Sequence, residues 1–412
     1  MKKRYIIEKR AEPEEISADY AASLDTLEGE ETDLTDSLDV ILKAREMTDE
    51  EVEKVRARGH IVEVFVDEDI FADEEITTDA RTASMADVAL YHGFVEAHAA
   101  GYRGQGRKIA VIDTGLSRAW EGRIAGRIFA RRSFVPGESH EDHTSGHGTH
   151  VMGTVVHNAP GALYGVYKNL STETGAGSAS YGILATNQAV KDGATDINQS
   201  YGGDGNENSP ASLANDAARR AGVRVNTASG NAQRGTTALT SDARSPASSR
   251  LGCTVGSGDI DGRLSDFSSW GKCVDIRAVG EAQTSWAVGG GYATMSGTSM
   301  ASPVVTAAGA VCGSKGASAD EIDKALYSST GDTRYSPAQE GHGILDVEFA
   351  VKKLTPKSKP GKPPSAPEKS YFPDLPRVAR WQFSKKVVPS ELRDCVLTLD
   401  GEDIGRFTPK EG

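Results

Sequence analysis

The 412-residue chain is 38% hydrophobic, contains 45 glycines and carries a formal net charge of −13 at pH 7. A chain of this length can bury a large core, and it fits one catalytic-sized domain with smaller parts attached. It contains no run of about 18 apolar residues, which a membrane-spanning helix needs. We therefore expect no membrane span. We also expect no nucleic-acid partner.

The first residues, MKKRYIIEKRAEPEE, include basic side chains but no apolar stretch of signal-peptide length. We therefore expect an intracellular protein, or one exported by a non-standard route. The four cysteines, Cys253, Cys273, Cys312 and Cys395, lack the paired spacing of a zinc site. Buried free thiols are expected, with a disulfide from Cys253 or Cys273 as the alternative in an oxidising setting.

Residues 1–80 hold essentially all of the net acidity, with 10 Lys and Arg against 25 Asp and Glu. Within them, KRYIIEKR, SLDVILKA and HIVEVFV have the pattern of short strands. The segment MTDEEVEKVRARG favours a helix with Thr48 as its cap, Glu51 three residues later and Gly59 as its stop. The pattern predicts a small α+β domain over residues 1–80 rather than an acidic tail.

Residues 81–354 alternate between strand-like and helix-like runs. KIAVID, ALYGVY, VRVNTA, GCTVGS and CVDIRAV favour strands, while SYGILATNQAVKDG and SPASLANDAARRAG favour helices. This alternation predicts a parallel sheet with helices on both faces, an α/β architecture.

A linker follows at residues 355–368, where five prolines occur among several lysines. The last part, residues 369–412, contains ARWQF, DCVLTL and the turn DGEDIG, which predict a small β appendage. Nothing in this part indicates a role.

Three residues stand where chemistry collects in a parallel sheet, at strand ends and helix starts. Asp113 ends the strand KIAVID, His147 lies between glycines in SGHGTHVMG, and Ser299 precedes the Ala/Val-rich run after Pro303. A serine hydroxyl needs a base to take its proton, and the base needs a carboxylate to fix its tautomer. The alternatives are purely structural roles, in which Asp113 is a turn residue and Ser299 is a helix cap.

The segment SHEDHTSGHGTH offers a different interpretation. Four histidines, His140, His143, His147 and His150, lie within eleven residues and suggest a metal-dependent hydrolase. A metalloprotease helix needs His-Glu-x-x-His, whereas His140 and His143 are only three residues apart in a Gly/Ser-rich stretch. The spacing therefore argues against a metal site but leaves it as an alternative.

The three segments VIDTG, GHGTHVMG and GTSMASP resemble the signature segments of the subtilisin-like serine proteases. The stretch SPASSRLGCTVGSGDIDGRLSDFSSWGKCVDI is similar to the proteinase K-like branch, and the resemblance covers about residues 96–350. It implies a subtilisin-like three-layer fold, with a mainly parallel sheet and helices on both faces. It also implies a serine endopeptidase, for which an inactive protease-like binding module is the alternative.

The resemblance implies a role for each matching residue. Asp113 becomes the orienting carboxylate, His147 the general base and acid, and Ser299 the nucleophile. TASGN matches the family's oxyanion segment, so Asn231 is implied to donate to the developing oxyanion with the N–H of Ser299, rather than to serve as a turn residue. An extended polypeptide substrate is implied to bind Gly175, Ala176 and Gly177 on one side and Ser200, Tyr201 and Gly202 on the other, with Ala228, Ser229 and Gly230 lining the primary pocket.

The small, uncharged walls of that pocket imply broad specificity with a preference for apolar or aromatic side chains. The chain departs from the family at Lys168, where an apolar strand residue is usual, and at Val304, where histidine is common. The chemistry needs no cofactor. A structural calcium ion is implied at Asp275, with carbonyls near Arg250 and Gly252, although Arg250 stands where proline is usual.

Residues 4–69 resemble the inhibitor-type propeptide of these proteases, and VDED is similar to its closing acidic signature. The resemblance implies a zymogen whose own propeptide is an intramolecular inhibitor. We expect the enzyme to cut itself within residues 72–86, ADEEITTDARTASMA.

Overall fold

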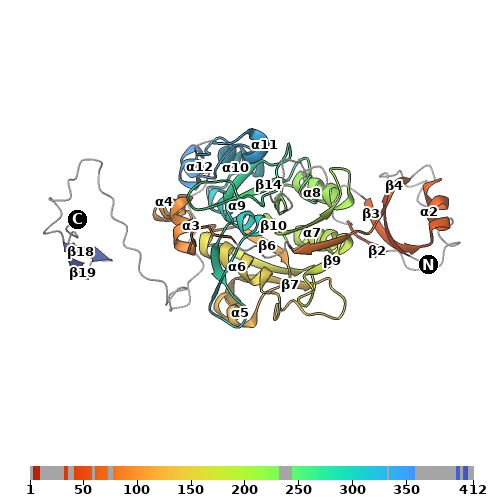
Figure 1. Cartoon of the computed structure of the whole chain (residues 1–412), viewed down its shortest axis with the longest axis horizontal. Helices are drawn as coiled ribbons and strands as arrows, with labels where there is room; N and C mark the ends of the chain where they lie inside the picture. Colours follow the sequence, from red (N-terminus) through yellow and green to blue (C-terminus); the bar gives the residue numbers. More distant parts are fainter. Residues whose placement is uncertain are drawn as a thin grey trace. The chain divides into compact units, whose positions relative to one another are not determined.

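The computed structural model describes residues 3–9, 32–35, 41–57, 61–72, 78–231, 244–331 and 334–357, together with strands at 396–399 and 402–406 (Figure 1). Its internal contacts divide the chain into two units, Met1–Ser365 and Ala366–Gly412. The first unit contains every candidate site residue, and each unit is described by itself.

Among its described residues, the N-terminal part of the first unit forms a four-stranded antiparallel sheet with a helix packed on it. Its strands are β1 (Lys3–Lys9), β2 (Thr32–Asp33), β3 (Ile41–Met47) and β4 (Ile61–Val66), in the order β2-β3-β1-β4. Helix α2 (Asp49–Arg56) begins with the predicted capping box, in which Thr48 accepts from the N–H of Glu51 and the Glu51 carboxylate accepts from the N–H of Thr48. The predicted strands and the Thr48 cap are confirmed, whereas the helix ends at Arg56 with Ala57 as its C-cap, and the predicted stop Gly59 lies outside the described residues.

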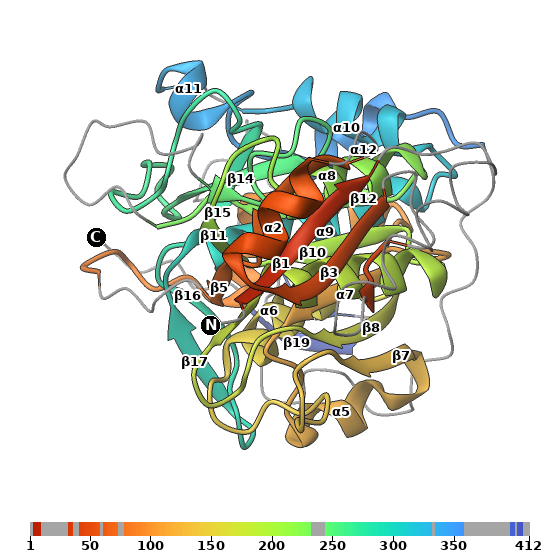
Figure 2. The ribbon, with the colours of Figure 1, turned by 90° about the vertical axis from the view of Figure 1, so that its right-hand side faces the viewer.

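This sheet is buried on both of its faces. On one face Tyr5 and Ile7 pack with Val52 and Val55 of α2. Ile6 points to the other face because side chains alternate along a strand, and it belongs to one core cluster with residues of the main domain such as Ile183. In Figure 2 the strands β1 and β3 and helix α2 lie in front of the main domain.

The main domain is built on a parallel seven-stranded sheet in the order β15-β14-β12-β10-β6-β8-β7. The five predicted strands are present as β6 (Lys108–Asp113), β8 (Leu163–Lys168), β12 (Arg224–Ala228), β14 (Cys253–Gly258) and β15 (Ile276–Val279). Two further strands, β7 (Ile128–Ser133) and β10 (Asp196–Gln199), were not predicted.

Helices cover both faces of this sheet, as alternate residues of β10 demonstrate. Asn198 accepts from Ser302 and Thr306 of α9 (Thr298–Gly313), which packs beside α6 (His147–Asn158). Its neighbour Gln199 faces the opposite side, where it bonds to Thr186 of α7 (Ala179–Lys191) and Asn215 of α8 (Pro210–Arg220). The fold is therefore the expected three-layer α/β arrangement.

Shorter elements complete the first unit. An antiparallel sheet in the order β13-β11-β5-β9 crosses the main domain, and β16 and β17 form a hairpin. None of the helices among the described residues is long and apolar enough to cross a membrane. The bounds are β5 (Asp69–Ala72), β9 (Ala176–Ser178), β11 (Tyr201–Asp204), β13 (Arg244–Ser245), β16 (Gln283–Trp286), β17 (Tyr292–Met295), α3 (Met85–Tyr91), α4 (Phe94–Ala99), α5 (Arg118–Ile124), the 3₁₀ turn η1 (Ala125–Arg127), α10 (Ala319–Tyr327), α11 (Pro337–Glu340) and α12 (Val347–Lys353).

The second unit contains an antiparallel hairpin of β18 (Val396–Leu399) and β19 (Glu402–Arg406). Strand β18 agrees with the β appendage predicted from DCVLTL, whereas residues 402–405 of the predicted turn DGEDIG belong to strand β19, and ARWQF lies outside the described residues. Cys253 and Cys312 are buried free thiols, as expected, whereas Cys273 forms no disulfide but is only partly buried, and Cys395 lies outside the described part.

Candidate active site

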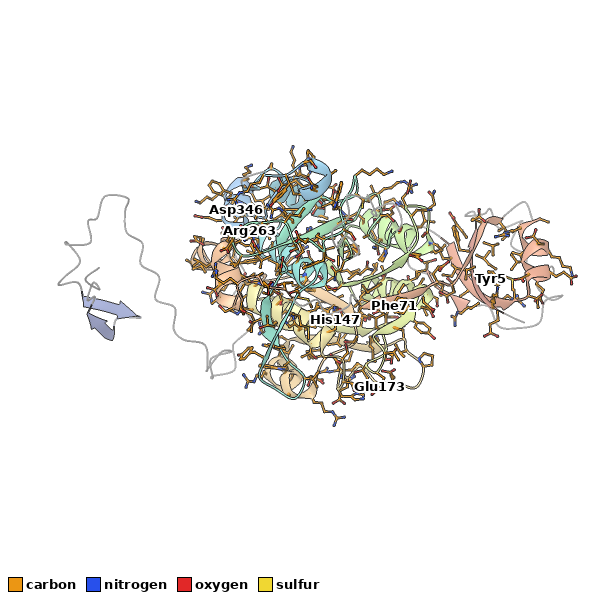
Figure 3. The ribbon with its side chains drawn as sticks, viewed as in Figure 1. Tyr5, Phe71, His147, Glu173, Arg263 and Asp346 are labelled. Atoms are coloured by element: carbon orange, nitrogen blue, oxygen red, sulfur yellow. The ribbon has the colours of Figure 1, made fainter. Side chains whose placement is uncertain are left out.

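The sheet and a helix start bring Asp113 and His147 together. Asp113 is the last residue of β6, and His147 is the first residue of α6, after Gly146 in a left-handed conformation with φ of 76°. The Nδ1 of His147 lies 2.7 Å from Oδ1 of Asp113, and both side chains are largely buried. Figure 3 labels His147 at this point of the fold.

The position of His147 depends on a residue that the sequence interpretation missed. The fully buried carboxylate of Asp142 accepts hydrogen bonds from the N–H of Gly146, from the N–H and hydroxyl of Thr149, and from the hydroxyl of Thr172. It thereby satisfies backbone donors at the start of α6. An aspartate just before a Gly-rich helix start was the available signal.

Ser299 is the second residue of α9 and is 1% exposed. The N-cap of α9 is Gly297, so the alternative reading of Ser299 as the cap is wrong. Its Oγ donates to the carbonyl of Ser200 at 3.0 Å, and the hydroxyl of Ser200 donates to the carbonyl of Ser299 at 2.8 Å. These paired bonds fix Ser299 against a predicted substrate-binding segment, at the positive end of a helix.

Asn231 follows β12 and has a fixed amide orientation. Its Oδ1 accepts from the N–H of Thr298 at 2.9 Å and from the hydroxyl of Thr298 at 3.0 Å. Its Nδ2 is buried and has no hydrogen-bond partner. A Cβ at Gly297 would lie 3.1 Å from that nitrogen, so glycine leaves space beside an available donor.

The two predicted substrate-binding segments lie on either side of strand β5. Ala72 pairs with Tyr201 of β11, and its N–H donates to the carbonyl of Gly175 at 2.8 Å. Ile70 pairs with Gly177 of β9. Ile70 is 2% exposed, whereas Phe71, which Figure 3 labels, is 50% exposed, so alternate side chains of β5 face into and out of the domain.

The predicted pocket residues Ala228, Ser229 and Gly230 lie at the end of β12, immediately before Asn231. Ala228 and Ser229 are each 3% exposed, and the hydroxyl of Ser229 donates to the carbonyl of Ser269. The N–H of Gly230 donates to the hydroxyl of Thr298. The fold therefore brings this segment and the start of α9 into direct contact.

The four clustered histidines do not converge on a common point. His140 contacts Glu121, His143 contacts Glu173, His147 contacts Asp113, and His150 contacts the carbonyl of Gln283. Burial lowers the pKa of His150 to about 3. Within the part of the chain that the structure describes, no group of three or more His, Cys, Asp and Glu residues could hold a metal ion.

Asp275 borders a separate pocket that offers oxygen donors. Its Oδ2 accepts from the N–H of Thr254 at 2.8 Å, and burial raises its pKa to about 7. The pocket is also lined by Ser248, Arg250 and Gly252, and the Arg250 guanidinium bonds to Glu207 and Asn208. The Asp275 carboxylate offers oxygen ligands of the kind that calcium prefers, whereas Arg250 and Lys272 bring positive charge to the same pocket.

Lys168, the departure noted in the sequence, is fully buried at the end of β8. Its Nζ donates to the carbonyl of Thr114 at 2.6 Å and lies 3.1 Å from Oε2 of Glu138. The ion pair and the carbonyl satisfy the buried ammonium group. Lys168 therefore links the segments that contain Thr114 and Glu138, next to Asp113.

Comparisons with known proteins agree with this arrangement. A model of the subtilase family matches residues 104–343. Subtilisin-like protease 3 of Trichophyton equinum is 37% identical over 238 residues, which are 53% of this chain and 55% of that protein. Alkaline elastase YaB of Bacillus sp. (strain YaB) is 31% identical over 290 residues, 67% of this chain and 74% of that protein. Subtilisin DY of Bacillus licheniformis is 33% identical over 267 residues, 61% of this chain and 93% of that protein.

The chain therefore belongs to the subtilase family. Its relatives include proteins named subtilisin-like protease and subtilisin. It spans about half the length of the Trichophyton relatives that it matches.

Proposed function

We propose that this chain hydrolyses peptide bonds with Ser299 as nucleophile, His147 as general base and acid, and Asp113 as the orienting carboxylate. The observation that carries the proposal is the 2.7 Å contact between His147 Nδ1 and Asp113 Oδ1, because it directs Nε2 of the same ring to the task of proton transfer. The proposed order is attack by Ser299, expulsion of the amine with a proton from His147, and hydrolysis of the acyl-enzyme by water.

The proposed oxyanion donors are Nδ2 of Asn231 and the backbone N–H of Ser299. Support comes from the two bonds that Thr298 makes to Oδ1 of Asn231, which leave Nδ2 as the available donor. Donors held in place before the reaction stabilise developing charge without reorganising. Loss of hydrolysis of an unfolded protein substrate in Ser299→Ala, with His147→Ala equally inactive, tests the assignment.

The proposed substrate is an extended polypeptide that lies between β9 and β11. The position of β5 between these strands supports this mode of binding, because main-chain pairing accepts many sequences. Small walls at Ala228, Ser229 and Gly230 favour apolar or aromatic side chains before the cleaved bond. Digestion of a peptide library tests this preference, and strict cleavage after Lys or Arg would contradict it.

The proposed state before activation is a zymogen inhibited by its N-terminal domain. Besides β5, Asp67 accepts from the N–H and hydroxyl of Ser180 and pairs with Arg4, while the carbonyl of Glu68 accepts from the N–H of Ala179. These bonds tie the N-terminal domain to the start of α7.

The proposed cut falls within residues 72–86, between β5 and the body of the main domain. On one side β5 occupies the cleft, and on the other Ala83 pairs with Gln283 of the main domain. Self-cleavage would remove about 8 kDa, since the 412 residues weigh 43.6 kDa. Ser299→Ala should remain at full length, and its trimming at the same bond in a protease-free host would refute self-processing.

The calcium proposal places one ion at Asp275, with the carbonyls of Arg250 and Gly252 as further ligands. The half-buried carboxylate, which borders the adjoining pocket, supports it. The ion would supply positive charge for stability and take no part in the hydrolysis. No observation favours a metal-dependent hydrolase, since the clustered histidines contact separate partners.

A further inference from the structure

The ammonium group of Lys168 is buried next to the candidate active site, and all of its donors have acceptors. Lys168 ends β8, is 0% exposed, and is the register partner of Asp113 in β6. Its Nζ donates to the carbonyl of Thr114 at 2.6 Å, lies 3.1 Å from Oε2 of Glu138, and lies 3.4 Å from the carbonyl of Glu141. An ammonium group has three N–H donors, so three acceptors satisfy a charge that would otherwise be costly to bury.

Thr114, which receives the shortest of these bonds, links the two members of the proposed catalytic pair. Its N–H donates to Oδ1 of Asp113 at 2.7 Å, the same oxygen that lies 2.7 Å from Nδ1 of His147. Its hydroxyl oxygen accepts from the N–H of Gly148, the residue after His147, at 2.9 Å. Thr114 therefore sets the position of the Asp113 carboxylate relative to the start of α6, and Lys168 holds the Thr114 carbonyl.

The chain after Thr114 packs tightly against α6. A Cβ at Gly148 would come within 2.5 Å of the carbonyl oxygen of Gly115. Only glycine at position 148 allows the two backbones to approach this closely. A shift of the Thr114 carbonyl would therefore be passed to the helix start that carries His147.

Glu138, the ionic partner of Lys168, reaches the same helix start by a second route. Its Oε2 accepts from the N–H of Thr172 at 3.0 Å, and the Thr172 hydroxyl donates to Asp142, the carboxylate that satisfies backbone donors of α6. Burial opposes ionisation of Glu138, but its hydrogen bonds outweigh this effect and hold its pKa below the usual value. Glu138 is therefore ionised at neutral pH and can balance the buried ammonium group.

We propose that Lys168 is a positioning residue for peptide hydrolysis: its ammonium group holds the Thr114 carbonyl and thereby keeps the Asp113 carboxylate in contact with the histidine of the proposed triad. This inference rests on the proposed peptidase function, and it adds a residue that touches neither the substrate nor the reacting atoms. A displacement of about 1 Å in a catalytic group can slow a reaction about 100-fold. Lys168 therefore acts on the rate of the reaction as well as on stability.

The first test is Lys168→Met, which removes the ammonium group and keeps a flexible, unbranched side chain. Active sites are titrated with a fluorophosphonate, so that kcat refers to competent molecules. We expect kcat for a chromogenic peptide to fall about 10- to 100-fold. KM should stay within about twofold of wild type, because the partners of Lys168 do not bind the substrate.

A second variant separates this effect from stability. Lys168→Met leaves the Glu138 carboxylate without its ionic partner, which lowers Tm by itself. The double variant Lys168→Met/Glu138→Gln removes that charge and keeps an oxygen for the N–H of Thr172, so it should recover most of the lost Tm. Its kcat should stay low, because the Thr114 carbonyl is still not held. Recovery of kcat together with Tm would show that Lys168 serves stability alone, and would overturn the inference even if Lys168→Met does not fold.

The matched control is Lys315→Met, at the opposite end of α9 from Ser299. Lys315 is also buried, and its Nζ donates to the carbonyls of Val351 and Leu354. This variant should lower Tm and keep kcat within about twofold of wild type.

Two outcomes would overturn the inference and leave the peptidase function intact. One is a wild-type kcat in Lys168→Met, and the other is an equal loss of kcat in Lys315→Met. Failure of wild type to cut any peptide or unfolded protein would instead refute the proposed function, and the inference with it.

Discussion

Two substitutions of Asn231 test the proposed oxyanion site. Both remove the side-chain amide nitrogen, but only one keeps a side-chain oxygen. Asn231→Ala removes the proposed donor Nδ2 and also the Oδ1 that accepts two bonds from Thr298. Asn231→Asp removes the donor but retains an oxygen for Thr298. The pair therefore separates loss of oxyanion stabilisation from loss of structure at the start of α9.

We expect both variants to lose about 100- to 1000-fold in kcat, or about 2.7–4 kcal/mol of transition-state stabilisation. KM should change little, because the donor acts on charge that develops only in the transition state. Asn231→Ala should also lower Tm, since Thr298 loses its acceptor, whereas Asn231→Asp should retain most of the wild-type Tm.

The assay is steady-state hydrolysis of one chromogenic peptide by processed enzyme, with active sites titrated so that kcat refers to competent molecules. Thermal unfolding of the same samples supplies the structural control. An Asn231→Asp enzyme with kcat within about threefold of wild type would refute the role of Nδ2, since removal of one such donor costs far more.

Three further predictions concern pH and calcium. Hydrolysis should fall on the acid side along a single protonation between about pH 6 and 7, where histidine ordinarily titrates, and undiminished turnover at pH 4 would contradict the role of His147. The Tm of Ser299→Ala should fall as the pH drops from 6.5 toward 4. Burial lowers the pKa of four histidines in the folded protein below their pKa in the unfolded chain, so the unfolded chain binds more protons in this pH range. A Tm that rises on acidification would contradict this. Burial raises the pKa of Asp275 to about 7, so the contribution of its protonated form to the stability of the fold is lost as the pH rises through 7. Calcium should therefore raise Tm more at pH 8, where Asp275 is ionised, than at pH 5. Asp275→Asn should abolish this difference. The four histidines are His92, His98 and His157, with pKa values of about 4, and His150, with a pKa of about 3.

The order of strands and helices could be predicted because local patterns determine it. The run KIAVID becomes β6 and ends at Asp113, as its apolar residues and the following turn indicate. The Thr48 cap was predictable because both partners of a capping box lie within four residues. Local sequence therefore carried most of the architecture.

What the sequence did not reveal depends on contacts between distant segments. Asp142 positions α6 partly through Thr172, thirty residues further along the chain. The contacts of Lys168 with Thr114 and Glu138 could not be predicted either, because both partners lie in other segments. The alternative reading of Ser299 as a helix cap was wrong because α9 already begins at Thr298, with Gly297 as its N-cap.

The measurement that tests the central claim most directly is labelling of the processed enzyme with a serine-directed fluorophosphonate, followed by peptide mapping. The account predicts one label per molecule, on Ser299, with loss of activity in proportion to labelling. Labelling should be lost in His147→Ala, because the hydroxyl is a weak nucleophile without its base. An enzyme that hydrolyses peptides but takes no label on Ser299, or that keeps full activity when Ser299 is labelled, would contradict the account.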